Sequence, residues 1–221
     1  MQGSELDRLV GALDDGPVGE LSDAFCSEVA SLIGVTDCSF AVIGAAGQRH
    51  TLGASSERAK TLDRWQFTLD QGPCLLAAQT GEVTSSTVVD APWPELAEKA
   101  RDLGYSAVAG VPLAVAGVRF GALNLQMDAG PVPADALERA VTAVEQLSPA
   151  LLDHLAAGIP ATAATSDRSV IHQATGIVAG QLGVSVEDAL AALRARAWSD
   201  DTLLDHLADG VVRGDVRLDR P

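Results

Sequence analysis

The stretch SAVAGVPLAVAGVRFGALNLQ, from Ser106 to Gln126, decides how the N-terminal part of this chain folds. Its two apolar runs, 106–115 and 118–126, are separated by the dipeptide Ala116-Gly117. A glycine-containing pair between two apolar runs is typical of a β-hairpin turn. Runs with so few charges suit central strands of an antiparallel sheet that are buried on at least one face. The sequence therefore predicts a hydrophobic hairpin here.

The residues before the hairpin predict two helices and three more strands. Apolar residues spaced by three and four indicate an amphipathic helix, whereas short β-branched or apolar runs between glycines indicate strands. The predicted elements are a helix over 21–33 that Gly34 ends, strands over 38–43, 48–54 and 83–89, and a helix over 93–103.

After the hairpin, a long helix is predicted from Ala134 to about Ala157. Its apolar seam has spacings of three and four and consists of Leu137, Val141, Val144, Leu147, Leu151 and Leu155. Such a seam packs either on the helix's own sheet or on a helix of a partner subunit. A similar stripe near the N-terminus, Leu6, Leu9, Val10 and Leu13, is too short to be stable alone and could join such a bundle.

Residues 158–165, GIPATAAT, mark a boundary, because Pro160 stops a continuous helix and the small residues have little to bury. We predict an α+β fold followed by a small all-α domain. The predicted divisions are a helical segment over 1–17, an α+β domain over 18–157, a linker over 158–165, a three-helix domain over 166–214 and a tail over 215–221.

Polar residues mark where the three C-terminal helices begin. Ser166-Asp167 is expected to open the first helix, which Gly183 ends. The segment from Ser185 to Asp188 resembles a capping box and opens the second. Ser199-Asp200-Asp201 is expected to open the third. Three helices this short form a very small core, so packing on a partner subunit is expected.

Composition excludes several classes of protein. The chain has 221 residues, 47% of them hydrophobic, and a formal net charge of −15. A broad basic surface for nucleic acid is excluded, so any phosphate-binding surface must be local. Three cysteines without short-spaced partners indicate free thiols in a reducing compartment. Without a signal-peptide pattern or a membrane-length apolar run, a soluble cytoplasmic protein is expected.

Nothing in the sequence indicates catalysis or a metal site. The histidines, His50, His154, His172 and His206, lie in separate segments without a carboxylate or cysteine at ligand spacing. Hydrolase, zinc-protease and P-loop motifs are absent. Cys74 follows Gly72-Pro73 at an expected helix start, where a thiol pKa can be lowered, although structural burial is the alternative. We expect a protein that is not an enzyme and predict no cofactor.

An ordered set of short motifs lies within about 18–157. The motifs are Gln71-Gly-Pro-Cys74, Ala78-Gln-Thr-Gly81, the strand 83–90, Pro92-Trp-Pro94, Val111-Pro-Leu113 and 117–125. Taken in this order, they resemble a GAF domain of the actinobacterial type. The resemblance implies an antiparallel sheet with flanking helices and a pocket for a small molecule. Nothing marks a bilin, haem or metal site, and the motif of cyclic-nucleotide-binding GAF domains is absent.

Five residues lie in the irregular segments where such a pocket would be lined. They are Trp65, Phe67, Cys74, Trp93 and Tyr105. The alternative is that they simply complete the core. An unidentified small-molecule ligand therefore remains an expectation.

The C-terminal region, about 166–214, contains a second ordered set of motifs. The segments are Arg168–Gly176 (RSVIHQATG), Gly183–Leu190 (GVSVEDAL), Leu193-Arg194 and Leu207-Ala208. Together they resemble an ANTAR domain. The resemblance implies a transcription antiterminator that binds a two-hairpin RNA, one hairpin per subunit of a homodimer. Thr175 departs from the family's lysine, and Asp200-Asp201 stands where the family carries asparagine and basic residues.

The residues expected to face RNA are few. Arg168, Arg194 and Arg196 suit phosphate contacts, and Gln173 suits a loop base. Ala174 and Gly176 would let the RNA backbone approach the helix. Trp198 fits a core or dimer anchor, or alternatively a base-stacking platform.

Charge leaves two functions open. Residues 166–221 contain six arginines, no lysine and nine acidic residues, a formal charge of −3. The first hypothesis is a regulator in which the GAF domain controls an RNA-binding dimer of ANTAR domains. The second is a sensor or scaffold whose tail has lost RNA binding and serves dimerisation or a protein partner. A third hypothesis, which does not rest on charge, is an enzyme or redox sensor built on Cys74.

Overall fold

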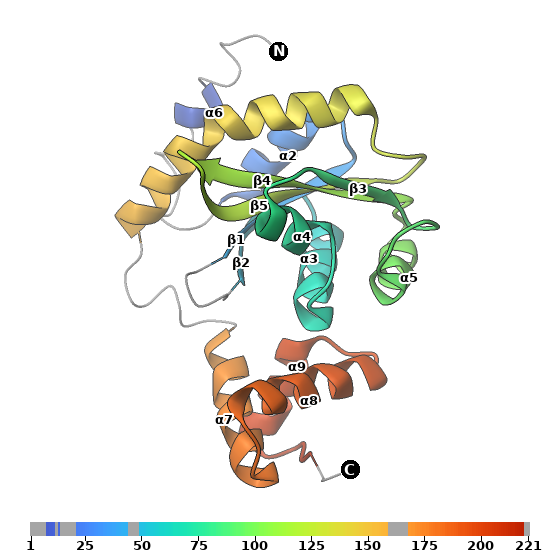
Figure 1. Ribbon diagram of the computed structural model, residues 1–221, viewed down its shortest axis with the longest axis vertical. Coiled ribbons are helices and arrows are strands. Elements are labelled where there is room, and N and C mark those ends of the chain that lie inside the picture. Colours follow the sequence, from blue (N-terminus) through green and yellow to red (C-terminus); the bar gives the residue numbers. More distant parts are fainter. Residues whose placement is uncertain (1–7, 12, 14–20, 44–48, 159–167, 219–221) are drawn as a thin grey trace. The chain divides into compact units, whose positions relative to one another are not determined.

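The computed structural model describes residues 8–11, 13, 21–43, 49–158 and 168–218 (Figure 1). The chain divides into two compact units, the first made of residues 1–66 and 70–158 and the second of 67–69 and 159–221. Each unit is described by itself below. Residues 44–48 between the first two predicted strands, most of the predicted linker, the predicted helix start at Ser166-Asp167 and Leu6 lie outside the described residues.

The first unit contains a five-stranded antiparallel sheet in the order β2-β1-β5-β4-β3. The strands are β1 (Asp37–Ile43), β2 (Arg49–Ala54), β3 (Thr84–Thr87), β4 (Ala107–Val115) and β5 (Val118–Met127). The predicted hairpin is confirmed as β4 and β5. Ala116 and Gly117 turn between them with φ angles of 50° and 81°, as a two-residue hairpin turn requires.

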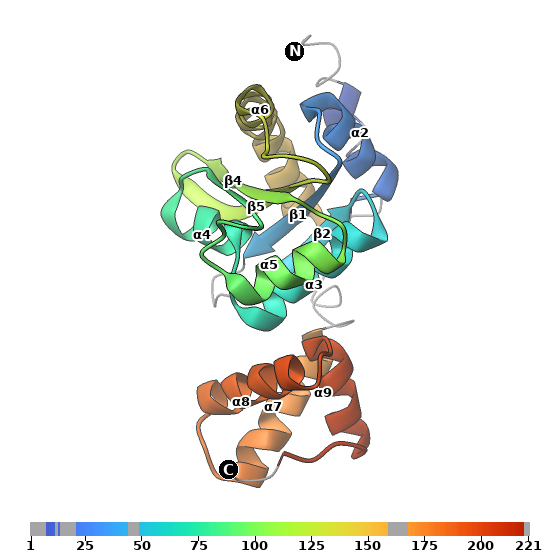
Figure 2. The same cartoon turned by 90° about the vertical axis from the view of Figure 1, so that its right-hand side faces the viewer.

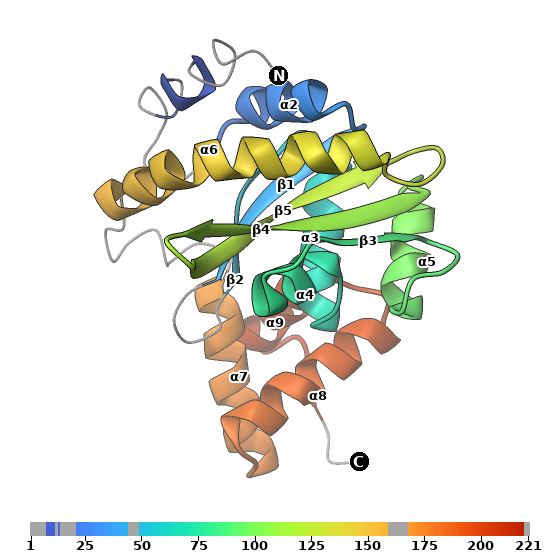
Figure 3. The same ribbon diagram turned by 45° about the horizontal axis from the view of Figure 1, so that its top comes forward.

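Helices cover both faces of this sheet. The helices α2 (Asp23–Ile33) and α6 (Ala134–Gly158) lie on one face, and α3 (Glu57–Leu69), α4 (Pro73–Thr80) and α5 (Pro94–Asp102) lie on the other (Figure 2). Helix α6 extends along the strands (Figure 3). Its buried residues join the main apolar cluster, which confirms the interpretation that its seam packs on its own sheet. Leu9 and Leu13 are buried in the same cluster.

The two faces of the sheet differ in chemistry because successive strand residues point to opposite sides. Leu123 and Leu125 of β5 belong to the apolar cluster with α2 and α6. Ala122 packs with α4, and Asn124 bonds to α3 on the other face. The first face is therefore apolar, and the second is small and polar.

The second unit is a three-helix domain, as predicted. Its helices are α7 (Arg168–Leu182), α8 (Val186–Ser199) and α9 (Leu204–Arg213). Gly183, with a φ of 65°, ends α7, and the Ser185 side chain caps α8 by accepting a hydrogen bond from the Asp188 backbone. The predicted start of α9 at 199–201 is wrong. Helix α8 continues to Ser199, and Leu203 precedes the first residue of α9.

Candidate functional site

Helix α7 turns one face to the core of the second unit and the opposite face outward. The buried residues of this helix are Ile171, Ala174, Thr175, Val178 and Leu182. Gln173 and Gly176, both expected to face RNA, are exposed. Ala174, expected beside them, lies in the core and does not belong to this surface.

Thr175 also points inward. Its hydroxyl donates a 2.7 Å hydrogen bond to the backbone carbonyl of Ile171 one turn earlier. The departure from the family's lysine therefore lies on the buried side of α7. The outward surface at this level of the helix is formed by Gln173 and Gly176.

The outward face of α7 is open and almost uncharged. From Ser169 to Leu182 the helix contains no Asp, Glu, Lys or Arg. A methyl group added to Gly176 or Gly180 would meet no atom of another part of the protein within 4 Å. A ligand backbone could therefore approach this face closely, with the Gln173 amide offering both donors and an acceptor.

The predicted arginines do not form one free cationic cluster. Arg168 is the first residue of α7, and its side chain lies outside the described part of the structure. Arg194 is half-buried on α8. The exposed Arg196 pairs with Asp200 one turn later, with 2.6 Å between Nε and the carboxylate. A phosphate at Arg196 would have to compete with this carboxylate.

Arg213, the last residue of α9, is also held in ion pairs. Arg213 binds the carboxylates of Asp209 and Asp215, and the hydrogen bond to Asp215 is the largest cause of its raised pKa. Trp198, on the last turn of α8, is only half-buried, so its predicted role as anchor or stacking platform stays a prediction.

In the first unit, buried polar side chains fill the space between the sheet and α3. The Asn124 amide of β5 donates to the Ser39 hydroxyl at 3.2 Å and to the Asp63 carboxylate at 3.0 Å. The Gln66 amide donates to the Asn124 carbonyl at 3.2 Å, and the Thr51 hydroxyl donates to Asp63. The groups thus satisfy one another without a ligand.

Helix α4 lies directly on the sheet. A Cβ atom at Gly110 of β4 would be 2.3 Å from the backbone oxygen of Pro73, which leaves no space even for a methyl group. Cys74 is fully buried beside Ala41, Ala77 and Ala122. Because reactive thiols are typically partly exposed, this burial gives no support to a redox role for Cys74.

Tyr105 belongs to a third cluster, centred on the buried Asp37. The Tyr105 hydroxyl donates to the Asp37 carboxylate at 2.9 Å, and the Ser55 hydroxyl donates to it at 2.8 Å. Arg58 pairs with Asp37 at 2.9 Å and with Asp128 at 2.9 Å, and its guanidinium lies over the Tyr105 ring. Burial, together with the Asp37 hydrogen bond, raises the pKa of Tyr105.

The five residues predicted to line a pocket lie in different surroundings. Cys74 lies under α4 and Tyr105 lies at the Asp37 cluster. The Trp65 ring contacts the Lys99 ammonium at 4.7 Å, Phe67 is half-buried near the end of α3, and Trp93 is half-buried just before α5. Their shared role in lining a pocket stays a prediction.

The sequence analysis missed the polar residues that do meet on this face: Ser39, Asp63, Gln66 and Asn124. The position of Asn124 between Leu123 and Leu125 is the signal that could have revealed it, because it places an amide on a buried strand.

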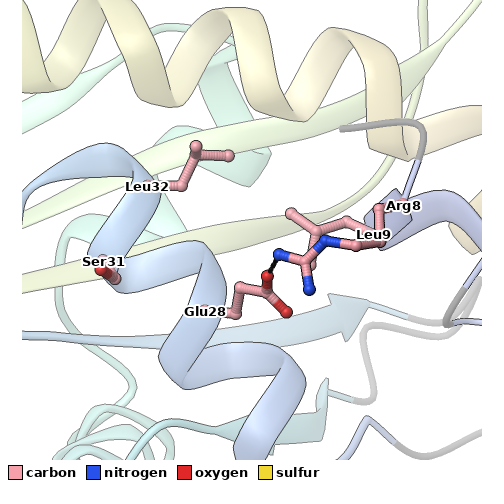
Figure 4. A pocket seen from close by; sticks show the side chains of 5 residues that line it. All are labelled: Arg8, Leu9, Glu28, Ser31 and Leu32. Carbon is pink, nitrogen blue, oxygen red and sulfur yellow. Dashed lines mark ion pairs between the residues drawn. The ribbon is translucent and has the colours of Figure 1, made fainter. Parts of the chain in front are cut away.

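A cavity of about 300 Å³ lies at the edge of the first unit, between the N-terminal helical turn and α2 (Figure 4). It is lined by Arg8, Leu9, Glu28, Ser31 and Leu32. Arg8 and Glu28 form an ion pair across it. This pairing leaves the cavity without a free charge to orient a ligand.

Two further properties concern only the described residues. They contain no group of three or more His, Cys, Asp and Glu side chains that could hold a metal ion. No single helix among them is long and apolar enough to cross a membrane.

Comparison with known proteins supports both halves of the sequence analysis. Residues 161–212 match the family model of the ANTAR domain. No curated protein matches the chain in sequence.

Solved structures resemble the N-terminal part of the chain. The GAF domain of a Coxiella burnetii phosphoenolpyruvate-protein phosphotransferase is 15% identical, with a TM-score of 0.52 over 71% of this chain and 96% of its own. The phycocyanobilin-bound GAF domain of a cyanobacterial phytochrome is 14% identical, with a TM-score of 0.51 over 72% and 98%.

An N-acylhomoserine-lactone-dependent LuxR-family transcription factor from Burkholderia cenocepacia is 17% identical, with a TM-score of 0.50 over 70% and 95%. At these identities the likeness shows the fold. The chain is therefore a GAF and ANTAR domain protein, in which a domain of GAF fold precedes an ANTAR domain at residues 161–212.

Proposed function

We propose that this protein is a cytoplasmic regulator whose GAF domain receives a signal and whose ANTAR domain binds RNA hairpins, as in transcription antitermination. The proposal includes a homodimer, with one hairpin held by each subunit, and gives the chain no catalytic role. The three cysteines are buried and form no disulfide, which suits the reducing cytoplasm.

The outward face of α7 carries the RNA-binding part of this proposal. Gln173 and Gly176 lie exposed within the matched ANTAR region, and the open space over Gly176 lets a nucleic-acid backbone approach. The amide of Gln173 can read a base edge or a 2′-hydroxyl of an unpaired loop. Arg168, the first residue of the same helix, supplies a cation for a phosphate.

Helix α7 itself offers a matched pair of variants for the test. Gln173 and Gln181 are both exposed glutamines on this helix, two turns apart. We expect Gln173→Ala to weaken binding of the full chain to a two-hairpin RNA at least about fivefold, because a lost base contact costs about 1–3 kcal/mol. Gln181→Ala should bind as the wild type does. Equal affinities for both variants, or no binding by the wild type, would contradict the proposal.

The signal for the GAF domain is proposed to be a small molecule, but its site must differ from that of the bilin-bound relative. The residues present do not fit a tetrapyrrole, because the polar side chains on this face bond to one another and α4 touches β4 at Gly110. A ligand entering here must displace the hydrogen bonds of Asn124. Binding of the ligand would affect the ANTAR domain only if the protein has two conformations and the ligand binds one of them more tightly.

A second function is favoured by the ion pairs of the ANTAR domain. Arg196 is held by Asp200, and Arg213 is held by Asp209 and Asp215. A tail in which the exposed Arg196 and Arg213 are paired in this way also fits a module for dimerisation or for a protein partner. Absence of RNA binding at low salt by a dimeric protein would select this function.

A further inference from the structure

Helix α6 is interrupted by a proline. The helix runs over 25 residues, from Ala134 to Gly158, and Pro149 lies inside it. A proline has no backbone N–H, so the carbonyl of Glu145, one turn earlier, loses the donor that it would have in a regular helix. Prolines are a common cause of helix bends, and Figure 1 shows α6 changing direction toward its C-terminal end. The helix therefore has a weak point in its second half.

The residue before the proline adds a second unsatisfied group. Ser148 is fully buried, and among the described residues its hydroxyl has no hydrogen-bond partner. Burying a hydroxyl without a partner costs free energy, so such a group in a native protein calls for an explanation. At this point of α6, an acceptor without its helical donor and a donor without an acceptor lie within one turn of each other.

The two groups complement each other. Serine and threonine hydroxyls in helices can donate to the backbone carbonyl three or four residues earlier. Thr142 does so in the same helix, where its hydroxyl donates to the Glu138 carbonyl at 3.0 Å. Ser148 stands three residues after Glu145, so a rotation about its Cα–Cβ bond, with a change in helix direction, would bring its hydroxyl to the Glu145 carbonyl. In the present structure this bond is not formed.

The parts of α6 before and after Pro149 are held differently. Before it, the helix contributes five buried side chains to the main apolar cluster: Ala136, Ala140, Ala143, Val144 and Leu147. After it, Leu151 is the one buried residue among 150–156, and Leu152 is 38% exposed. The first part is therefore fixed on the sheet, whereas fewer buried side chains hold the second part in one direction.

We propose that Ser148 and Pro149 form a hinge that gives α6 two conformations. In the conformation of the present structure, the Ser148 hydroxyl is unbonded. In the other, it donates to the Glu145 carbonyl, and the part of α6 after Pro149 takes a different direction. Each conformation gives up something: the first leaves polar groups unsatisfied, and the second moves Leu151 out of the apolar cluster.

The position of the hinge in the chain gives it a consequence. The ANTAR region, residues 161–212, follows α6 in the sequence. A change of direction at Pro149 changes where the chain leaves the first unit, so a ligand that favours one conformation has a route to the residues that follow. The hinge itself goes beyond the proposed function and does not depend on RNA.

Distances between two spin labels, measured in the full chain by double electron–electron resonance, test the hinge. Ala134→Cys and Asp153→Cys, both at exposed positions, place one label on each side of Pro149. In a straight helix these positions would lie about 28 Å apart. The three native thiols are buried, which directs the labels to the introduced ones. We expect two distance populations, the smaller at least about a tenth of the total.

Two further substitutions should each leave a single population. Ser148→Ala removes the donor of the second conformation and keeps the present direction. Pro149→Ala supplies the N–H that the Glu145 carbonyl lacks, so the helix straightens and the distance lengthens. Alanine favours the helix in both variants, so the thermal midpoint should be kept or raised. Thr142→Ala removes the hydroxyl that is already bonded in the same helix and is the matched control, which should retain both populations.

Three results would overturn the proposal. A single population in the otherwise unchanged labelled chain would show a fixed bend. Two populations that persist in Ser148→Ala would show that its hydroxyl does not hold the second conformation. Two populations that persist in Pro149→Ala would show that the proline is not the pivot. None of these measurements involves RNA, so the hinge and the proposed RNA binding stand or fall separately.

Discussion

The two domains of this protein place their polar side chains differently. The GAF domain buries several of them, whereas the ANTAR domain places them mainly at its surface. The GAF domain buries Asp37, Asp63 and Asn124 and satisfies them with internal hydrogen bonds. In the ANTAR domain the described core is apolar apart from Thr175, and the charged side chains are exposed or, like Arg194, half-buried. This difference indicates which part of each domain can respond to a bound molecule: the interior of the GAF domain and the surface of the ANTAR domain.

For the GAF domain, a response at the buried network of Asp63, Gln66 and Asn124 requires that internal hydrogen bonds break, because these groups bond to one another. For the ANTAR domain, binding can occur on the existing surface, because the outward face of α7 is open. Interior substitutions should therefore change stability in the first domain, and surface substitutions should change binding in the second.

The largest effect is expected at the Asp37 cluster. Asp37→Ala removes the partner of Tyr105, Arg58 and Ser55 at once. Because breaking a buried pair leaves polar groups unsatisfied, we expect a loss of about 3 kcal/mol in the free energy of unfolding, measured by urea denaturation. Asp128→Ala, which removes the exposed partner of Arg58, should cost no more than about 1 kcal/mol. Equal costs for both variants would contradict a buried cluster.

A methyl group should have opposite effects in the two domains. Gly110→Ala should destabilise by about 1–3 kcal/mol, because its Cβ would be 2.3 Å from the Pro73 oxygen. Gly180→Ala should stabilise by up to about 1 kcal/mol, because the exposed helix gains propensity in open space. Thermal denaturation measures both. A harmless Gly110→Ala would show that α4 does not pack closely on the sheet.

A smaller effect is expected where Asp200 holds Arg196. Asp200→Asn should raise RNA affinity about two- to threefold, since exposed pairs of this kind are worth about 0.3–0.5 kcal/mol and one negative charge is lost. Glu187→Gln removes an exposed acidic charge elsewhere on α8 and serves as the matched control. If both variants gain equally in fluorescence anisotropy titrations, net charge rather than the pair limits binding.

The smallest effect concerns pH. Tyr105 is the only tyrosine, and its pKa is raised above the ordinary value of 10.0 by burial and by Asp37. Its protonated form is favoured in the folded state, so this contribution to stability is complete below pH 10 and is lost as the pH rises above it. Tyrosinate absorbance should stay low at pH 10 in the folded protein and appear on unfolding. Ordinary titration in the folded state would contradict the buried hydroxyl.

Most of the fold could be predicted from the sequence, because apolar periodicity and glycines mark it. Examples are the hairpin turn at Ala116-Gly117 and the end of helix α2 at Gly34. Gly117 and Gly34 both adopt the left-handed backbone conformation that a glycine at a turn or a helix end is expected to adopt. Helix α3 was not predicted. Its inward positions include Asp63 and Gln66, so the apolar spacing that indicates a helix is missing.

The candidate site was predicted only in part. Helical spacing alone could not show that Ala174 faces the core while Gln173 and Gly176 face outward. The pairing of Arg196 with Asp200 required the end of α8 to be placed at Ser199, whereas the acidic run 199–201 had suggested a helix start. Polar runs mark helix ends as well as starts.

The salt dependence of RNA binding tests the central claim, that the outward face of α7 contacts RNA with few cations, most directly. The affinity of the full chain for a two-hairpin RNA should fall with a log–log slope of about −1 to −2, as expected for two or so phosphate contacts. A slope steeper than about −4 would contradict the claim, because it requires a broad basic surface, which a chain with a net charge of −15 is not expected to present. No binding at the lowest salt would contradict it as well and would leave the ANTAR domain as an assembly module.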